Sequence, residues 1–190
     1  MLITLYGINN IGKSTQAKRL VKRLEEVGKE VVYVKYPVYD IGPTGPFIND
    51  VLRGGLQDVS EHELQMWFVL NRYQYQDQLK AHLAAGKIVI AEDYVGTGIA
   101  WGVAKGLDVE WLENLNKHLI KEDLAILFEG KRRMGAKEEV HVHEQNDELV
   151  ARCAVVHREL GKKYGWEVSQ VKDGINRTTE SLWEMVKGSI

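Results

Sequence analysis

Short runs of apolar residues alternate along the chain with longer segments in which apolar residues recur every three or four positions. The apolar runs occupy residues 2–6, 30–37, 88–91, 123–130 and 166–171. Continuous apolar runs of this length are typical of parallel strands that are buried on both faces of a sheet. The helical periodicity lies between them, in residues 16–27, 60–86, 109–119, 146–166 and 178–188. This alternation predicts an α/β fold, with a doubly wound, five-stranded parallel sheet flanked by helices.

Polar residues mark where three of these helices should begin. Ser60 and Glu63 have the spacing of a capping box, and Asp108 and Thr178 stand where an N-cap is expected. We also expect a short helix within residues 47–53, and a loop with a short helix over residues 95–106.

The length and charge of the chain limit what it can be. With 190 residues, the chain suits one domain over residues 1–190. A formal net charge of −2 argues against a broad basic surface for nucleic acid or anionic membrane. No apolar run approaches the roughly 18 residues that a membrane span needs. We therefore expect a cytoplasmic protein whose partners are neither nucleic acids nor membranes. Cys153, the only cysteine, is expected to be a buried core residue.

A glycine-bounded loop directly follows the first apolar run. Gly7, Gly12, Lys13 and Ser14 satisfy the phosphate-loop pattern G-x-x-x-x-G-K-[ST], between a predicted strand and a predicted helix. Backbone N–H groups of such a loop and the helix N-terminus together bind polyphosphate. Lys13 should project into solvent and reach the β- and γ-phosphates, and Ser14 should contact Mg²⁺. The expected ligands are ATP and Mg²⁺, bound by Gly7, Asn10, Gly12, Lys13, Ser14 and Thr15.

Two acidic residues, Glu92 and Asp93, end the third apolar run. Ligands of an open α/β sheet bind beyond the carboxyl ends of its strands, so these carboxylates can contact the same Mg²⁺. Exposed loop charges are the alternative interpretation. At the end of the second run, Lys35 and Tyr36 can face the same cleft, or Lys35 can be a solvated lysine.

The long helix carries an aromatic side chain beside hydrogen-bond donors. Phe68, Asn71 and Arg72 lie within four residues, so they can share one side of the helix. A core position alone would explain Phe68 but not the neighbouring arginine.

Basic residues gather after the fourth apolar run. Arg132 and Arg133 belong to a cluster around Gly135 without an apolar stripe. Such a cluster is either a solvated turn or a mobile basic lid, approximately residues 130–142, that closes over a transferring phosphate.

Taken together, these motifs resemble those of thymidylate kinases, a family of nucleoside monophosphate kinases, over essentially the whole chain. The resemblance rests on the phosphate loop, KYP at 35–37, FVLNR at 68–72, EDYVGTGIAW at 92–101 and GKRRMGAKE from Gly130. It implies that Phe68 stacks on the acceptor base, that Arg72 hydrogen-bonds the edge of the base, and that Trp101 crowds the position of a 2′-hydroxyl. Arg132 or Arg133 would be the catalytic lid arginine, acting with Lys13.

The resemblance also implies a wider set of residues at the acceptor site. These residues are Asn9, Lys35, Tyr36, Pro37, Asn71, Tyr94, Thr97 and Gly98. The chain departs from the family pattern at two points. Asn9 stands where the loop usually has a carboxylate, and Glu92-Asp93 stands where the family has Asp-Arg, so an arginine that would hold the acceptor phosphate is absent from that position. Lys35, Arg53 or a lid residue can take its place.

Three functions remain open from the sequence. The leading hypothesis is ATP-dependent phosphorylation of a deoxynucleoside monophosphate, dTMP first among them. A deoxynucleoside kinase that acts on the 5′-hydroxyl is the second, and a nucleotide-binding regulatory protein without turnover is the third. The expected partners are small-molecule nucleotides. An apolar helix face can serve either the core or a homodimer, so both a monomer and a homodimer fit the sequence.

Overall fold

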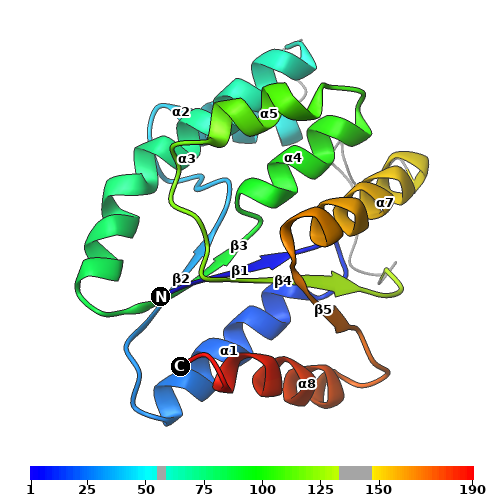
Figure 1. The fold of residues 1–190 in the computed structure, drawn as a ribbon. Coiled ribbons are helices and arrows are strands. Elements are labelled where there is room, and N and C mark those ends of the chain that lie inside the picture. Colours follow the sequence, from blue (N-terminus) through cyan, green and yellow to red (C-terminus); the bar gives the residue numbers. More distant parts are fainter. Residues whose placement is uncertain (55–58, 133–146) are drawn as a thin grey trace.

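The computed structural model describes residues 1–54, 59–132 and 147–190. Within these residues, five strands form one parallel sheet in the order β2-β3-β1-β4-β5 (Figure 1). The strands are β1 (Leu2–Tyr6), β2 (Val31–Lys35), β3 (Ile88–Glu92), β4 (Leu124–Glu129) and β5 (Glu167–Gln170). The predicted α/β fold with a doubly wound, five-stranded parallel sheet is confirmed.

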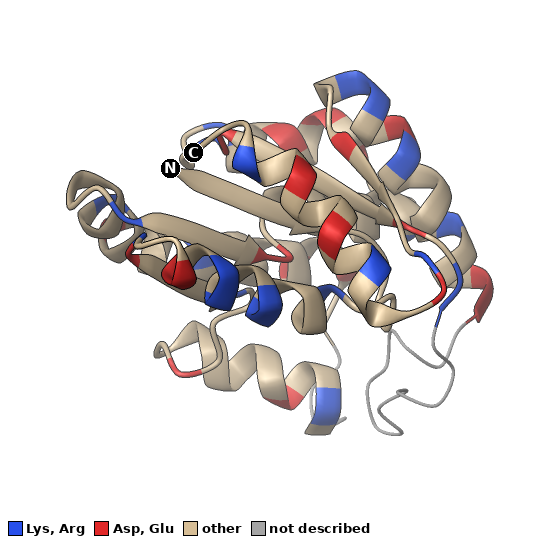
Figure 2. Cartoon of the chain, turned by 90° about the horizontal axis from the view of Figure 1, so that it is seen from below, with Lys and Arg blue, Asp and Glu red and all other residues tan. Residues whose placement is uncertain are grey.

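Helices cover both faces of the sheet. Helices α1 (Lys13–Glu26) and α8 (Ile175–Lys187) lie on one face, and α3 (Glu61–Ala84), α4 (Val95–Ala104) and α7 (Asp147–Tyr164) lie on the other (Figure 1). Helix α5 (Val109–Asn116) packs against α3 and α4, and α2 (Thr44–Asn49) packs against α3 and continues into a π-helical turn, η1 (Asp50–Gly54). Figure 2 shows basic and acidic residues interspersed on the helices, which agrees with the small net charge.

The central strands are apolar because helices cover both of their faces. Every residue of β1 and β3 is buried, whereas β5, at the edge of the sheet, buries only Ser169. Cys153 is fully buried in the core, as expected. None of the described helices has the length and apolar character that a membrane crossing requires.

Helix starts follow the predicted caps in two of three cases. Ser60 Oγ accepts a hydrogen bond from Glu63 N at 3.2 Å, and Asp108 Oδ1 accepts one from Trp111 N at 2.7 Å. The prediction for Thr178 is wrong, because α8 begins at Ile175 and Thr178 Oγ1 instead accepts from Lys172 N at 3.0 Å. The hydroxyl thus holds the preceding loop against the helix.

Two predicted short helices differ in extent from those observed. The helix expected within residues 47–53 begins earlier, as α2 at Thr44, and ends in η1. The segment expected to be partly loop is helical throughout α4. Its glycines permit close packing: a Cβ on Gly96 would lie 2.6 Å from the Trp166 ring, and one on Gly102 would lie 2.7 Å from Leu112.

The strand register brings three functional segments to one edge of the sheet. Leu5 and Lys35 both pair with Glu92, so the carboxyl ends of β1, β2 and β3 are level. The phosphate loop follows β1, the acidic pair ends β3, and Lys35 ends β2. This edge is where an open α/β sheet binds its ligands.

Candidate active site

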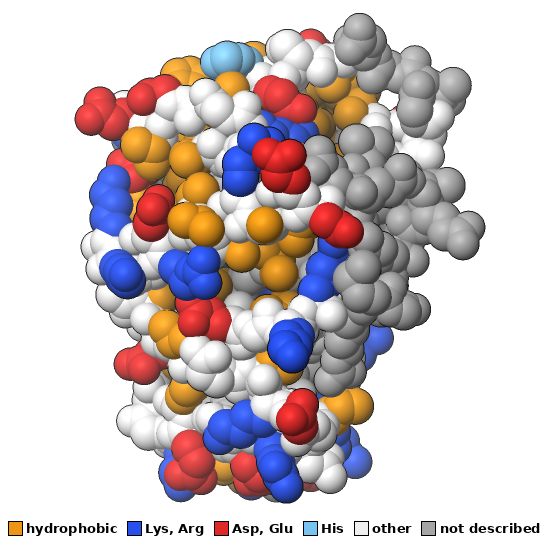
Figure 3. Space-filling model, turned by 90° about the vertical axis from the view of Figure 1, so that its right-hand side faces the viewer, with side chains coloured by type: hydrophobic (Ala, Val, Ile, Leu, Met, Phe, Trp, Pro, Cys, Tyr) orange, Lys and Arg blue, Asp and Glu red, His pale blue; other side chains and the backbone are white. Residues whose placement is uncertain are grey.

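A cavity of about 390 Å³ lies beyond the carboxyl ends of β1, β2 and β3. Charged side chains of both signs and hydrophobic side chains are mixed on the face toward which these strand ends point (Figure 3). The cavity is lined by Asn9, Asn10, Gly12, Lys13, Ser14, Thr15, Lys35, Tyr36, Pro37, Tyr39, Leu52, Arg53, Phe68, Arg72, Glu92, Asp93, Thr97, Gly98 and Trp101. The structure therefore brings most of the sequence-predicted site residues to one place.

The phosphate loop at one end of this cavity has the backbone that its glycines allow. Gly7 and Gly12 have φ values of +131° and +103°, which L-residues with a Cβ rarely adopt. A Cβ on Gly7 would also lie 2.8 Å from the carbonyl oxygen of Phe128, so the loop could not pass so close to β4. Asn10 has a φ of +63°, in the left-handed region that Asn tolerates better than most residues.

Lys13 is folded onto its own loop. Its Nζ donates to the carbonyl oxygens of Gly7 at 2.7 Å and Ile8 at 2.9 Å, and lies 3.3 Å from Asp93 Oδ1. The residue is only 4% exposed, so the expectation that its side chain projects into solvent is wrong. Lys13 nevertheless lines the cavity at the N-terminus of α1, where the helix dipole also favours an anion.

Glu92 is held by three groups that contact its carboxylate. Ser14 Oγ donates to Oε1 at 2.7 Å, Tyr33 OH donates to Oε2 at 2.5 Å, and Lys35 Nζ lies 3.1 Å from Oε1. Burial acts to raise the pKa of Glu92, but the ammonium groups of Lys13 and Lys35 and the two hydroxyl donors outweigh it and hold the pKa below its usual value. Glu92 is 1% exposed, which rules out the alternative of an exposed loop charge.

Asp93 lies beside Lys13, in a left-handed conformation with φ +59°. Thr97 Oγ1 donates to Asp93 Oδ1 at 3.1 Å, from the first turn of α4. Burial raises the pKa of Asp93 more than the nearby Lys13 ammonium lowers it. The position that the resemblance assigns to an arginine is thus occupied by an acid that neutralises the phosphate-loop lysine.

These oxygens form a donor set that suits magnesium. Mg²⁺ prefers carboxylate, hydroxyl and phosphate oxygens. Ser14 Oγ and Glu92 Oε1 lie within hydrogen-bond distance of each other, and Asp93 lines the same cavity. The residues present therefore fit the ion that the phosphate loop implies.

An aromatic cage with a buried guanidinium forms the other end of the cavity. Phe68, Arg72 and Trp101 line it from α3 and α4. Arg72 is 3% exposed, and burial lowers its pKa to about 10. Its Nε donates to Asn116 Oδ1 at 3.1 Å, whereas its Nη2 has no hydrogen-bond partner among the described residues. A buried donor of this kind that lines a cavity is suited to a ligand oxygen.

Gly98 leaves room for the Arg72 guanidinium. A Cβ at this position would lie 3.0 Å from both Nη1 and Nη2. The glycine in the tract at 92–101 therefore allows the guanidinium to pack against α4.

Apart from the lid arginines, three sequence-predicted residues lie outside the cavity lining. Gly7 begins the phosphate loop, and its lack of a Cβ lets the loop pass close to β4. Asn71 is fully buried and bonds to Val38 and Thr44, so it holds the segment after β2 and does not line the cavity. Tyr94 is 1% exposed and packs against Tyr36, with ring centroids 5.0 Å apart.

The lid prediction falls largely beyond what the structure describes. Arg132 is not among the residues that line the cavity, and its Nη1 pairs with Asp147 Oδ1 at 2.9 Å. Arg133 and the rest of the expected lid lie outside the described residues.

Sequence reasoning missed two residues that position the site. Tyr33 orients Glu92, and Asn116 holds Arg72. A signal for Tyr33 was present: it lies two residues before Lys35 in a strand, so both side chains point to the same face. No comparable pattern linked Asn116 to Arg72, since they are 44 residues apart.

Comparison with known proteins agrees with this geometry. A family model described as thymidylate kinase matches residues 5–184. The "Probable thymidylate kinase" of Thermococcus kodakarensis is 39% identical over 137 residues, which are 68% of this chain and 66% of the relative. The thymidylate kinase of Caenorhabditis elegans is 30% identical over 146 residues, 72% of this chain and 66% of that protein. The matched segment thus spans about two thirds of each relative.

Among solved structures, thymidylate kinase from Candida albicans superposes with a TM-score of 0.84 and 25% sequence identity. The match covers 99% of this chain and 91% of the Candida protein. The family match, the relatives and the shared fold agree, and the chain belongs to the thymidylate kinase family.

Proposed function

We propose that the protein transfers the γ-phosphoryl group of ATP to dTMP, giving dTDP and ADP. The observation that carries this proposal is one cavity with two different ends. Lys13, Ser14 and the loop amides at one end suit a polyphosphate, and Phe68 and Arg72 at the other suit a planar base with a hydrogen-bonding edge. A donor and an acceptor nucleotide can therefore lie with their phosphates facing each other.

In this reaction an oxygen of the dTMP phosphate attacks the γ-phosphorus in line, and the bond to the β–γ bridging oxygen breaks. The chain supplies no nucleophile, so its contribution is to position the reactants and to neutralise charge. Lys13 would face the β- and γ-phosphates. Ser14, with Glu92 and Asp93, would hold Mg²⁺, which would offset the negative charge of the phosphates.

Base recognition would rest on Phe68, Arg72 and Trp101. Phe68 would stack on the thymine ring. Arg72 Nη2, which has no hydrogen-bond partner within the part of the chain that the structure describes, would donate to a carbonyl oxygen of the base. Trp101, 5% exposed beside Gly98, would occupy the space of a ribose 2′-hydroxyl.

Lys13 is assigned to the donor phosphates and Arg72 to the base, so other cations must bind the acceptor phosphate. Among the described residues that line the cavity, these are Lys35 and Arg53. Arg53 stacks over the Tyr39 ring, with its Cζ 4.8 Å from the ring centroid. We assign both to the acceptor phosphate, in place of the arginine that the family has at position 93. A lid arginine, Arg132 or Arg133, would add charge during transfer.

Free nucleotides are the partners that this reaction requires, so we place the enzyme in the cytoplasm. The test is an ADP-release assay with ATP and Mg²⁺ across deoxynucleosides and their monophosphates. The proposal requires release with dTMP and little with thymidine.

A deoxynucleoside kinase is the second candidate, and one observation favours it. Glu92 and Asp93 both line the cavity, and a carboxylate near a 5′-hydroxyl could accept its proton. Release of ADP with thymidine but not with dTMP would select this function instead.

A further inference from the structure

An ammonium group lies against the two oxygens that we assign to magnesium. Lys35 Nζ is 3.1 Å from Glu92 Oε1 and 3.3 Å from Ser14 Oγ, and these two oxygens are themselves 2.7 Å apart. The three groups therefore form one triangle. It lies between the end of β2, the end of β3 and the N-terminus of α1.

The position of this ammonium conflicts with a divalent ion at the same oxygens. Mg²⁺ binds oxygen at about 2.0–2.1 Å and demands octahedral geometry. An ion on Ser14 Oγ would then lie within roughly 5 Å of Lys35 Nζ, since the ammonium is itself close to that oxygen. Two like charges at such a distance in a partly buried site repel each other.

The Lys35 side chain is free to change its conformation, whereas the Glu92 side chain is held in place. Lys35 is the last residue of β2, an edge strand, and its side chain is 50% exposed on a flexible four-carbon stem. Glu92 is 2% exposed at its side chain, and Tyr33 holds its other oxygen, Oε2, at 2.5 Å. Departure of the ammonium would therefore leave the carboxylate oriented, with Oε1 still facing Ser14.

We propose that Lys35 competes with Mg²⁺ for the Ser14–Glu92 pair and leaves it when the metal–nucleotide complex binds. The inference rests on the proposed function only in taking the phosphate loop as a site for a magnesium-bound nucleotide. The released ammonium is then free to face the acceptor phosphate. Lys35 is in this respect a positioning residue, because it sets the affinity of the metal site without holding the metal.

The test compares the magnesium dependence of nucleotide binding in three variants. Binding of a non-hydrolysable ATP analogue is measured while Mg²⁺ is varied, without an acceptor. Lys35→Met should lower the Mg²⁺ concentration at half-saturation three- to tenfold, because it keeps the stem and removes the competing charge. Lys35→Arg keeps the charge and should stay within twofold of wild type.

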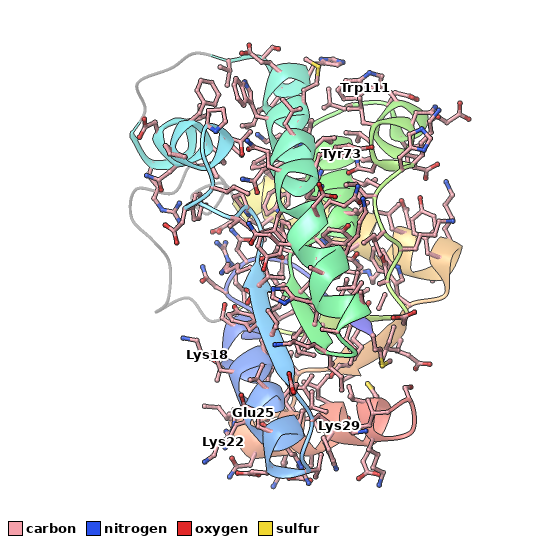
Figure 4. The ribbon with its side chains drawn as sticks, turned by 90° about the vertical axis from the view of Figure 1, so that its left-hand side faces the viewer. Lys18, Lys22, Glu25, Lys29, Tyr73 and Trp111 are labelled. Atoms are coloured by element: carbon pink, nitrogen blue, oxygen red, sulfur yellow. The ribbon has the colours of Figure 1, made fainter. Side chains whose placement is uncertain are left out.

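Lys29→Met is the matched control. Lys29 is exposed and lies just before β2 (Figure 4). Lys35 ends the same strand, so the two residues are separated by roughly 20 Å of extended chain. The Mg²⁺ concentration at half-saturation of nucleotide binding should be the same in Lys29→Met as in wild type. An unchanged or higher Mg²⁺ requirement in Lys35→Met would overturn the proposal. The measurement uses no acceptor, so a failure to phosphorylate dTMP would leave its outcome interpretable.

Discussion

Asn71 offers a direct test of how the acceptor side of the site is supported. Its side-chain Oδ1 accepts from Val38 N at 2.7 Å, and its Nδ2 donates to Val38 O and to Thr44 Oγ1, both at 2.9 Å. Asn71→Ala removes three hydrogen bonds of about 1 kcal/mol each and leaves two backbone groups of Val38 without their partner. We expect the free energy of unfolding to fall by about 3 kcal/mol, which lowers the melting temperature by roughly 6–12 °C for a chain of this size.

The same substitution should act on one substrate only. The segment that Asn71 holds carries Pro37 and Tyr39, which line the cavity. The three hydrogen bonds of the Asn71 side chain go to Val38 and Thr44, and none of them goes to the phosphate loop. The KM for dTMP should therefore rise severalfold while the KM for ATP stays close to wild type. Thermal unfolding and steady-state kinetics measure the two effects.

The control for Asn71 lies on the same helix. Gln78→Ala removes a side-chain amide at an exposed position of α3 and should change stability by less than about 0.5 kcal/mol. If Asn71→Ala destabilises the protein no more than Gln78→Ala does, its hydrogen bonds contribute little and the reasoning fails. An equal rise in both KM values would mean that the substitution disturbs the whole site.

Three further predictions concern other parts of the molecule. Lys13→Ala should abolish transfer, because the Lys13 ammonium is proposed to face the β- and γ-phosphates. Turnover of more than about a tenth of the wild-type value would contradict the phosphate-loop assignment. Arg72→Ala should raise the KM for the acceptor and flatten the preference among bases, with ATP affinity nearly unchanged, and equal loss for both substrates would show a structural role. Burial lowers the pKa of His157 to about 3, whereas a histidine in an unfolded chain has a pKa of about 6.5. The unfolded state therefore binds the proton more tightly, and the free energy of unfolding decreases as the pH falls from 6.5 toward 3. The free energy of unfolding is measured by urea unfolding across this pH range, and His157→Asn should reduce its decrease by up to about 1.4 kcal/mol per pH unit. If wild type and His157→Asn lose stability equally with falling pH, His157 is not the source of the loss.

The sheet and the phosphate loop could be predicted from the sequence because both leave a contiguous pattern. A strand covered by helices on both faces is mostly apolar, as β1 is apart from Thr4 and β3 is up to Glu92 at its carboxyl end. The loop motif needs no tertiary information, since its glycines, lysine and serine are adjacent in the chain. Their placement between a strand and a helix is also local.

The roles of individual side chains within a motif could not be predicted in the same way. Phe68, Asn71 and Arg72 are neighbours in sequence, yet Asn71 points to the segment after β2 and the other two line the cavity. Adjacent residues on a helix are rotated by about 100°, so only the packing of α2 and α4 around α3 decides which one meets the ligand. Thr178 is a similar case, because its hydroxyl serves a loop contact that sequence spacing does not reveal.

The charges at the cavity suggest why an acid can stand at position 93. Lys13 pairs with Asp93 and Lys35 with Glu92, so two ammonium groups and two carboxylates balance one another, and of the four side chains only that of Lys35 is substantially exposed. Unpaired buried charges are strongly unfavourable, so the buried Lys13 ammonium needs the Asp93 carboxylate beside it. If a magnesium-bound nucleotide entered, the partners could be exchanged: the ammonium groups of Lys13 and Lys35 would pair with phosphate oxygens, and Glu92 and Asp93 would hold the metal. Each of the four charges would then have an opposite charge beside it both before and after the nucleotide binds. An arginine at position 93 could not pair with Lys13, so Lys13 would lose its Asp93 partner in the site without nucleotide.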